Sequence, residues 1–139
     1  MAEGEHKLEA QVLTPEGEVF SGELEMLSTR TATGEVGILA RHIPMIARLV
    51  PAELRLHKSD SDVETYAQGE GWMEVFANRA RVLIAEAIPP DELDVSDLKQ
   101  RADEAKQRLD EAVDDSAAAE QAQRELARAE AFIQIAENR

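Results

Sequence analysis

Three histidines, at positions 6, 42 and 57, are the side chains best suited to acid–base or metal chemistry in this sequence. None of them stands at the spacing of a zinc motif such as HxxxH or HExxH. Glu35 and His42 combine an acid with an imidazole, but no nucleophile motif such as GxSxG accompanies them. The sequence therefore predicts neither a metal site nor a catalytic site. A small hydrolase that uses Glu35 and His42 stays as an alternative.

Composition narrows the remaining classes of function. The 139 residues include no cysteine, so the chain has no thiolate or disulfide chemistry. A formal net charge of −14 disfavours nucleic acid and anionic lipid as the main partner, because both attract Lys and Arg. Gly34 and Gly37 form only GxxG, and no stretch reaches the roughly 18 apolar residues of a membrane span. We expect a chain that is soluble by itself, binds other proteins and holds no cofactor.

The composition changes near Pro89 and Pro90. All seven glycines and all five prolines lie at or before residue 90, whereas residues 91–139 contain 11 alanines. Turn-forming residues thus fill the first part of the chain, and helix-forming residues fill the second. We predict two domains, over residues 1–88 and 89–139.

Alternation of apolar and polar residues with a period of two indicates β-strands in the first part. Turn formers separate the alternating stretches at the intervals typical of a sandwich. The sequence therefore predicts an antiparallel β-sandwich over residues 6–88. The alternating positions are Leu8, Ala10 and Val12; Leu24 and Met26; Leu54 and Leu56; Val63 and Thr65; and Val82 and Ile84.

The second part has two amphipathic patterns whose apolar residues are spaced three and four apart, as in helices with a heptad seam. A short connection at residues 113–116 predicts an antiparallel two-helix hairpin, with Ser116 as the cap of the second helix. Alanine fills most seam positions and buries little apolar surface, so we expect a marginally stable hairpin. Either it stays packed on the sandwich or it opens and packs on another protein. The larger seam residues are Leu98, Leu109, Leu126 and Ile133.

The stretch GEVGILARHIP, residues 34–44, resembles the G-E-(L/I/V)-G-I-(L/Y)-P-G-H-x-P signature of the epsilon subunit of F-type ATP synthases. Ala40 and Arg41 replace the Pro-Gly of that signature. VLTPEGEVFSGELE is similar to the first hairpin of the family. GEGWMEVFANRARVLIAEA is similar to a later one, but it departs at Arg81 and Ile84 from the usual V-(T/S)-(V/I)-L-A. These stretches occur in the order of the family, and a helical hairpin follows them.

The resemblance implies a non-catalytic rotor subunit of the central stalk. In the family the sandwich docks on the gamma subunit and rests on the ring of c subunits, which couples ion flow to ATP synthesis. This implies a peripheral position at the cytoplasmic face of the bacterial cell membrane. The ring-facing loop corresponds to Glu35, Ile38, Arg41 and His42, where Gly34 and Gly37 permit tight turns and Pro44 fixes the exit. The same stretch also suits a core role for Ile38 and Leu39 and a hydrogen-bonded strand position for His42.

The resemblance further implies that the hairpin is a switch, which permits turnover when folded down and obstructs ATP hydrolysis when extended into the alpha/beta catalytic head. Arg124 and Arg128 are candidate contacts with the beta subunit, although Glu120 and Arg124 equally suit a solvated i,i+4 pair. Some family members bind ATP through (I/L)-D-x-x-R-A. Here Asp97 and Leu98 replace the Arg and Ala. Since an aspartate repels phosphate, we predict no ATP site or only weak binding.

An alternative function needs no ATP synthase. The same fold suits a free-standing β-sandwich adaptor that binds an unrelated protein and carries a helical clasp. Association with gamma and the catalytic head distinguishes the two functions.

Overall fold

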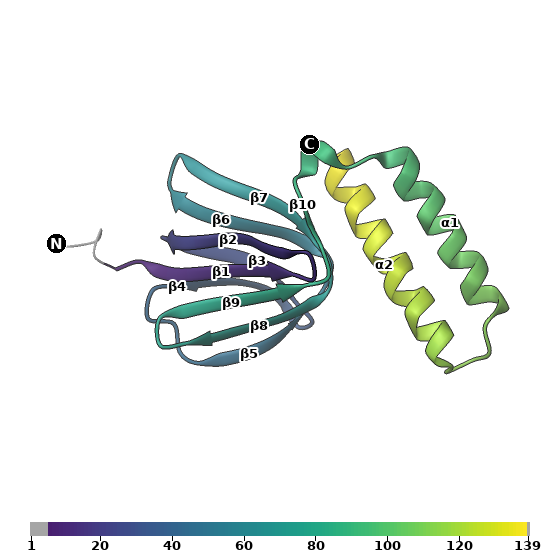
Figure 1. Ribbon diagram of the computed structural model, residues 1–139, viewed down its shortest axis with the longest axis horizontal. Coiled ribbons are helices and arrows are strands. Elements are labelled where there is room, and N and C mark those ends of the chain that lie inside the picture. The colour runs from purple at the N-terminus through teal and green to yellow at the C-terminus, as the bar shows by residue number, and fades with distance from the viewer. Residues whose placement is uncertain (1–5, 139) are drawn as a thin grey trace. The chain divides into compact units, whose positions relative to one another are not determined.

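The chain divides into two compact units, one ending at Ile88 and the other beginning at Pro89. The computed structural model describes residues 6–138. Figure 1 shows that the first unit is a β-sandwich and the second a pair of helices. The predicted fold class, a sandwich followed by a helical hairpin, is therefore confirmed.

One continuous sheet folds over on itself to make the two layers of the sandwich. Its strands are β1 (Leu8–Thr14), β2 (Gly17–Leu24), β3 (Met26–Thr31), β4 (Gly34–Leu39), β5 (Met45–Leu49), β6 (Ala52–Ser59), β7 (Asp62–Gln68), β8 (Gly71–Phe76), β9 (Arg79–Ile84) and β10 (Ala87–Ile88). The first layer has the order β5-β8-β9-β1-β2, and the second has the order β10-β7-β6-β3-β4. The pair Thr31 and Leu49 joins β3 to β5 and so connects the layers. Neighbouring strands are antiparallel, except that β1 runs parallel to β9.

Alternate residues of each strand point between the layers and form the core. In β1 the predicted alternation matches the observed burial, because Leu8, Ala10 and Val12 are buried and Glu9 is exposed. Strands β6 and β9 also bury the residues predicted from their alternation. The core consists of Leu8, Ala10, Val12, Leu24, Leu27, Ile38, Leu49, Leu54, Leu56, Met73, Val75, Ala80, Val82 and Ile84.

Two alternating stretches differ from the prediction. Leu24 and Met26 belong to two strands, because β2 ends at the first and β3 begins at the second. In β7 the alternation is present, but Val63 and Thr65 lie on the outer face. The reason is the register with β6, which places Val63 opposite the outward-facing His57. A period of two predicts a strand, but it does not fix which face of the strand is buried.

A buried polar network joins β3 and β7 to the connection between β5 and β6. The side chain of Gln68 is fully buried. Its Oε1 accepts a hydrogen bond of 2.7 Å from Thr29 Oγ1, and its Nε2 donates one of 2.9 Å to the carbonyl of Val50. Within residues 6–138 every buried side-chain polar atom has a hydrogen-bond partner. The network therefore avoids the cost of burying an unpaired amide.

The second unit starts with a short 3-10 helix, η2 (Pro90–Glu92), and continues with the helices α1 (Val95–Glu111) and α2 (Ala117–Glu137). Asp94 caps α1, because its carboxylate accepts a hydrogen bond of 3.2 Å from the backbone N–H of Asp97. Ser116 caps α2 as predicted, with Oγ accepting from the N–H of Ala119 at 3.1 Å. The two caps fix where the helices of the hairpin begin.

Small residues dominate the buried stripe between the helices. Of the four larger residues predicted for the seam, Leu98 is buried, whereas Leu109, Leu126 and Ile133 are half-buried. A strict heptad spacing describes only a narrow stripe, and the covered face of α2 is wider than that. The buried residues are Leu98, Ala102 and Ala105 on α1 and Ala119, Ala122, Ala129, Phe132 and Ile135 on α2.

Candidate functional site

The residues predicted to face the ring do not form one cluster. Glu35 is the second residue of β4, beside the turn from β3. Its carboxylate forms an ion pair of 2.9 Å with Arg30 on the neighbouring strand. Arg41 and His42 follow the other end of β4. Glu35 lies four positions before Leu39, the last residue of β4, which is about 13 Å along an extended strand. A flat partner at one end of β4 therefore meets either Glu35 or the loop with Arg41 and His42.

Ile38 is a core residue in this structure. Its side chain is fully buried and lies opposite Leu27 of β3. The prediction that Ile38 contacts a partner is therefore wrong for its side chain, because alternation along β4 turns it inward. The next residue, Leu39, is 57% exposed.

The β4–β5 loop is held in place by Asn78. The backbone N–H of Arg41 donates to Asn78 Oδ1 at 2.8 Å, and Asn78 Nδ2 donates to the carbonyl of Lys7 at 2.8 Å. His42 Nδ1 lies 2.7 Å from the carbonyl of Ile43, so its ring contacts its own loop. These bonds give the loop the rigidity expected of a docking element.

The tight turn of this loop falls on an unexpected residue. Arg41 has a φ of 66°, in the left-handed region that favours glycine. It occupies the position at which the epsilon-subunit signature has glycine. Gly34 has the positive φ expected of a turn residue, at 135°, but Gly37 lies inside β4 with no positive φ. The prediction of a turn at Gly37 is therefore wrong.

An exposed surface with several large apolar residues lies on the outer side of β5, β8 and β9, where Arg48 and Glu74 stand among them, and the sequence analysis did not identify it. We call it the apolar face. The register places Trp72 of β8 opposite Leu83 of β9, and β5 carries Ile46 on the same side of the sheet. The signal was present in GWMEVF, where β8 has large apolar residues on both of its faces. The exposed residues are Ile43 and Ile46, each 73% exposed, Phe76 at 64%, Trp72 at 52% and Leu83 at 46%.

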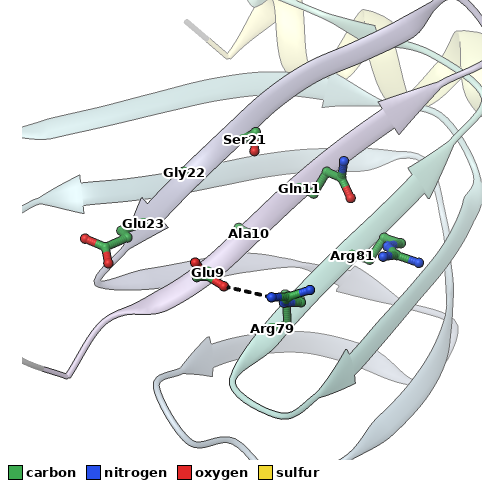
Figure 2. Close-up of a pocket in the computed structure, with 9 residues that line it drawn as sticks. Glu9, Ala10, Gln11, Ser21, Gly22, Glu23, Arg79 and Arg81 are labelled. Atoms are coloured by element: carbon green, nitrogen blue, oxygen red, sulfur yellow. Dashed lines mark ion pairs between the residues drawn. The ribbon is translucent and has the colours of Figure 1, made fainter.

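A hollow of about 310 Å³ adjoins the apolar face on strands β2, β1 and β9. Figure 2 shows the small residues Gly22 and Ser21 along its β2 side, and charged side chains around it. Arg79 pairs with Glu9 at 3.3 Å. The hollow therefore offers both space and charge beside an apolar surface. Its lining residues are Glu9, Ala10, Gln11, Ser21, Gly22, Glu23, Arg79, Ala80 and Arg81.

A separate charged cluster lies where β6 and β7 approach Phe20 of β2. Lys58 pairs with Glu64, which also accepts a 2.8 Å hydrogen bond from the Tyr66 hydroxyl. The Lys58 ammonium lies 5.8 Å from the centre of the Phe20 ring, within cation–π range. The hydrogen bond from Lys58 lowers the pKa of Glu64 and raises that of Lys58. Burial, together with the bond to Glu64, raises the pKa of Tyr66 to about 12.

On the hairpin, the two candidate arginines differ. Arg124 is exposed, and within residues 6–138 it forms no ion pair with Glu120. Arg128 is half-buried and already takes part in an interaction within the chain. Between the helices, Arg108 bonds Glu125 at 2.5 Å and Lys99 lies 3.9 Å from Glu137. Arg124 is thus the more available of the two for a partner.

The described residues give no sign of a metal or membrane-spanning element. No group of three or more His, Asp or Glu side chains within residues 6–138 is arranged to hold a metal ion. Neither of the described helices has the combination of length and hydropathy that a membrane crossing requires.

Comparison with known proteins gives this geometry its context. The family model "ATP synthase, Delta/Epsilon chain, beta-sandwich domain" matches residues 7–90. The ATP synthase epsilon chain of Halalkalibacterium halodurans is 34% identical over 129 residues, which cover 93% of this chain and 96% of that protein. The chain belongs to the ATP synthase epsilon chain family. It is accordingly a stalk subunit and not the catalytic one.

Other members of the epsilon chain family match over most of their length. The protein of Priestia megaterium is 39% identical over 78% of this chain and 80% of its own, and that of Levilactobacillus brevis is 31% identical over 100% and 96%. Among solved structures, a chain of the Euglena gracilis mitochondrial ATP synthase superposes with a TM-score of 0.74 at 21% identity, covering 91% of this chain and 79% of that one. A chain from the Tetrahymena thermophila mitochondrial ATP synthase superposes with a TM-score of 0.66 at 18% identity, covering 92% of this chain and 95% of that one. These two structures support the fold.

Proposed function

We propose that this epsilon chain turns with the rotor of its ATP synthase, couples ion flow through the c-ring to ATP synthesis, and inhibits ATP hydrolysis through its C-terminal hairpin. The partners are the gamma subunit, the c-ring and the alpha/beta catalytic head. The two similar solved chains come from assemblies described as "OSCP/F1/c-ring" and "central stalk/cring". As a subunit of this complex, the chain is then peripheral and lies, in our proposal, at the cytoplasmic face of the bacterial cell membrane.

The apolar face is the observation that carries the proposal. Monomeric proteins rarely leave a contiguous group of large apolar side chains in water, and such surfaces usually bind another protein. Trp72, Ile46 and Leu83 are more exposed than core packing would allow, and they lie on adjacent strands. We assign the gamma subunit to this surface, because it is the partner that must hold the sandwich on the rotor.

The two ends of β4 then take different roles. The loop with Arg41 joins the β8–β9 turn through Asn78, and this turn directly follows Phe76 of the apolar face. The loop is thus continuous with the gamma surface. Glu35 and Arg30 form a polar, exposed pair at the other end. Polar loops of the c-ring match that end better, so we keep Glu35 as the ring contact and place Arg41 and His42 at the rim of the gamma surface.

The hairpin has the properties of an inhibitory element that changes its packing. Five of the eight buried residues of its stripe are alanine, so separating the helices exposes less apolar surface than separating a leucine-rich pair would, although Leu98, Phe132 and Ile135 also become exposed. Its interhelical ion pairs are solvent-exposed and contribute little to stability. In the extended state, exposed Arg124 meets acidic segments of the beta subunit. The Asp94 carboxylate is used as a helix cap and Asp97 adds negative charge, so no ATP, or only weakly bound ATP, is expected there.

Trp72 provides the test of the docking proposal, because it is the only tryptophan of the chain and is half exposed. Adding the catalytic head with its gamma subunit should shift the Trp72 emission to shorter wavelength as water is excluded. A Trp72→Phe chain supplies the background from the head. Ile46→Asp should weaken binding about tenfold or more, whereas Val63→Asp, at an exposed position on the outer face of β7 in the second layer, should not.

Two results would contradict the proposal. An unchanged Trp72 spectrum at saturating head would exclude the apolar face as the contact. Equal weakening by Ile46→Asp and Val63→Asp would show that the site has no specificity. Failure of the chain to bind the head at all would favour the free-standing adaptor.

A further inference from the structure

Arg81 lies where the apolar face meets the hollow. It stands on the outer side of β9, two residues before the exposed Leu83, and lines the hollow together with Arg79. The related epsilon motif has threonine or serine at this position, so the positive charge is a feature of this chain. The hollow extends from Arg81 across β1 to the small residue Ser21 on β2.

The guanidinium of Arg81 has no ion-pair or hydrogen-bond partner within residues 6–138. Glu74 lies directly opposite it on β8, but no nitrogen–oxygen distance between them is within 4.0 Å. Gln11, its neighbour on β1, donates its amide hydrogen to Glu18 at 2.9 Å. Arg79, by contrast, is paired with Glu9, as the dashed line in Figure 2 shows. Arg81 is therefore the free cation of the hollow among the described residues.

A partner that covers the apolar face also removes water from Arg81. Removing water from an unpaired guanidinium costs free energy, and contacts with neighbouring apolar side chains do not compensate for this cost. A carboxylate of the partner compensates for it by pairing with the guanidinium. The hollow is large enough for an acidic side chain, and like-charge repulsion from Glu23 on its β2 side favours the β9 side for that carboxylate. We propose that Arg81 is a specificity-determining residue, which receives a carboxylate from the docking segment of this chain's own gamma subunit. This inference rests on the proposed docking of gamma on the apolar face.

The test compares Arg81→Thr, which restores the residue type of the family motif, with Arg55→Thr as a matched control. Arg55 is also exposed on a strand, but it lies on the outer side of the second layer. The Kd for the catalytic head with its gamma subunit is measured with each full-length chain at several salt concentrations. Thermal unfolding of each variant confirms that it is folded.

Arg81→Thr should raise the Kd about tenfold or more at low salt and should reduce its salt dependence, because a desolvated charge pair is lost. Arg55→Thr should leave both unchanged. A loss of affinity with Arg81→Thr no greater than that of the control would overturn the inference. If the wild-type chain binds the head and shifts the Trp72 emission in that case, the docking proposal survives. If the wild-type chain does not bind, both fail.

Discussion

The backbone N–H of Arg41 donates a hydrogen bond of 2.8 Å to the side-chain oxygen of Asn78. The side-chain nitrogen of Asn78, Nδ2, donates a hydrogen bond to the carbonyl of Lys7. Asn78 has a φ of 62° and lies in the turn between β8 and β9. One side chain thus joins three segments at the end of the sandwich where the β4–β5 loop meets the apolar face.

Replacing Asn78 should loosen the β4–β5 loop without unfolding the sandwich. Asn78→Gly keeps a residue that tolerates positive φ but removes both hydrogen bonds, so the Arg41 amide should exchange hydrogen roughly tenfold faster. Asn78→Asp keeps the acceptor for Arg41 and serves as the control. Equal exchange of the Arg41 amide in wild type and Asn78→Gly would show that the bond does not hold the loop.

Arg41→Gly should stabilise the chain. A non-glycine residue at a φ of 66° costs about 1 kcal/mol relative to glycine, and the change leaves the backbone bond to Asn78 in place. The same substitution at Arg48, an exposed position inside β5, should destabilise by about 0.5 to 1 kcal/mol, because glycine weakens a strand. Urea unfolding of both variants measures the changes in the free energy of unfolding, which should have opposite signs. A loss of stability with Arg41→Gly would contradict the strain at this position.

Gly71 should tolerate no side chain. A Cβ at this position would collide with the carbonyl oxygen of Leu83 and lie 2.8 Å from the Cα of Ile84, both of which are backbone atoms. Gly71→Ala should therefore lower the free energy of unfolding by about 1 to 3 kcal/mol. Gly22→Ala, whose nearest neighbour is the Phe20 ring at 3.4 Å, is the control and should change little. Similar melting temperatures for the two variants would refute the close approach of β8 to β9.

The Tyr66 hydroxyl should make the sandwich sensitive to alkali. Its pKa rises from an ordinary 10.0 to about 12, so the folded chain holds this proton more tightly than the unfolded chain does. The resulting stabilisation is complete below pH 10 and is lost as the pH rises toward 12. Urea midpoints across this range should fall more steeply for the wild type than for Tyr66→Phe. Parallel curves would show that the hydroxyl does not contribute.

The sequence predicted the features that depend on local pattern. Alternation in residues such as Leu8, Ala10 and Val12 predicts a strand because one face of each strand is buried. The loss of glycine and proline after residue 90 coincides with the start of the helices, and Ser116 was recognisable as a cap because its side chain bonds within three residues.

Features that depend on strand pairing could not be predicted from the sequence. Ile38 and Leu39 are adjacent and both apolar, and only the register of β4 with β3 determines which of them is buried. The left-handed backbone at Arg41 was hidden because arginine rarely adopts it. The apolar face joins residues from β5, β8 and β9 that are far apart in the chain, so no local pattern could assemble it.

The central claim is that the sandwich holds the chain on the rotor while the hairpin controls hydrolysis. The most direct measurement is ATP hydrolysis by the catalytic head with its gamma subunit, in the presence of the full-length chain or a chain ending at Ile88. Circular dichroism confirms that the shortened chain is folded, and Trp72 emission confirms that it binds. We predict that the full-length chain inhibits hydrolysis and that the shortened chain binds without inhibiting. Equal inhibition by both chains would contradict the regulatory role of the hairpin.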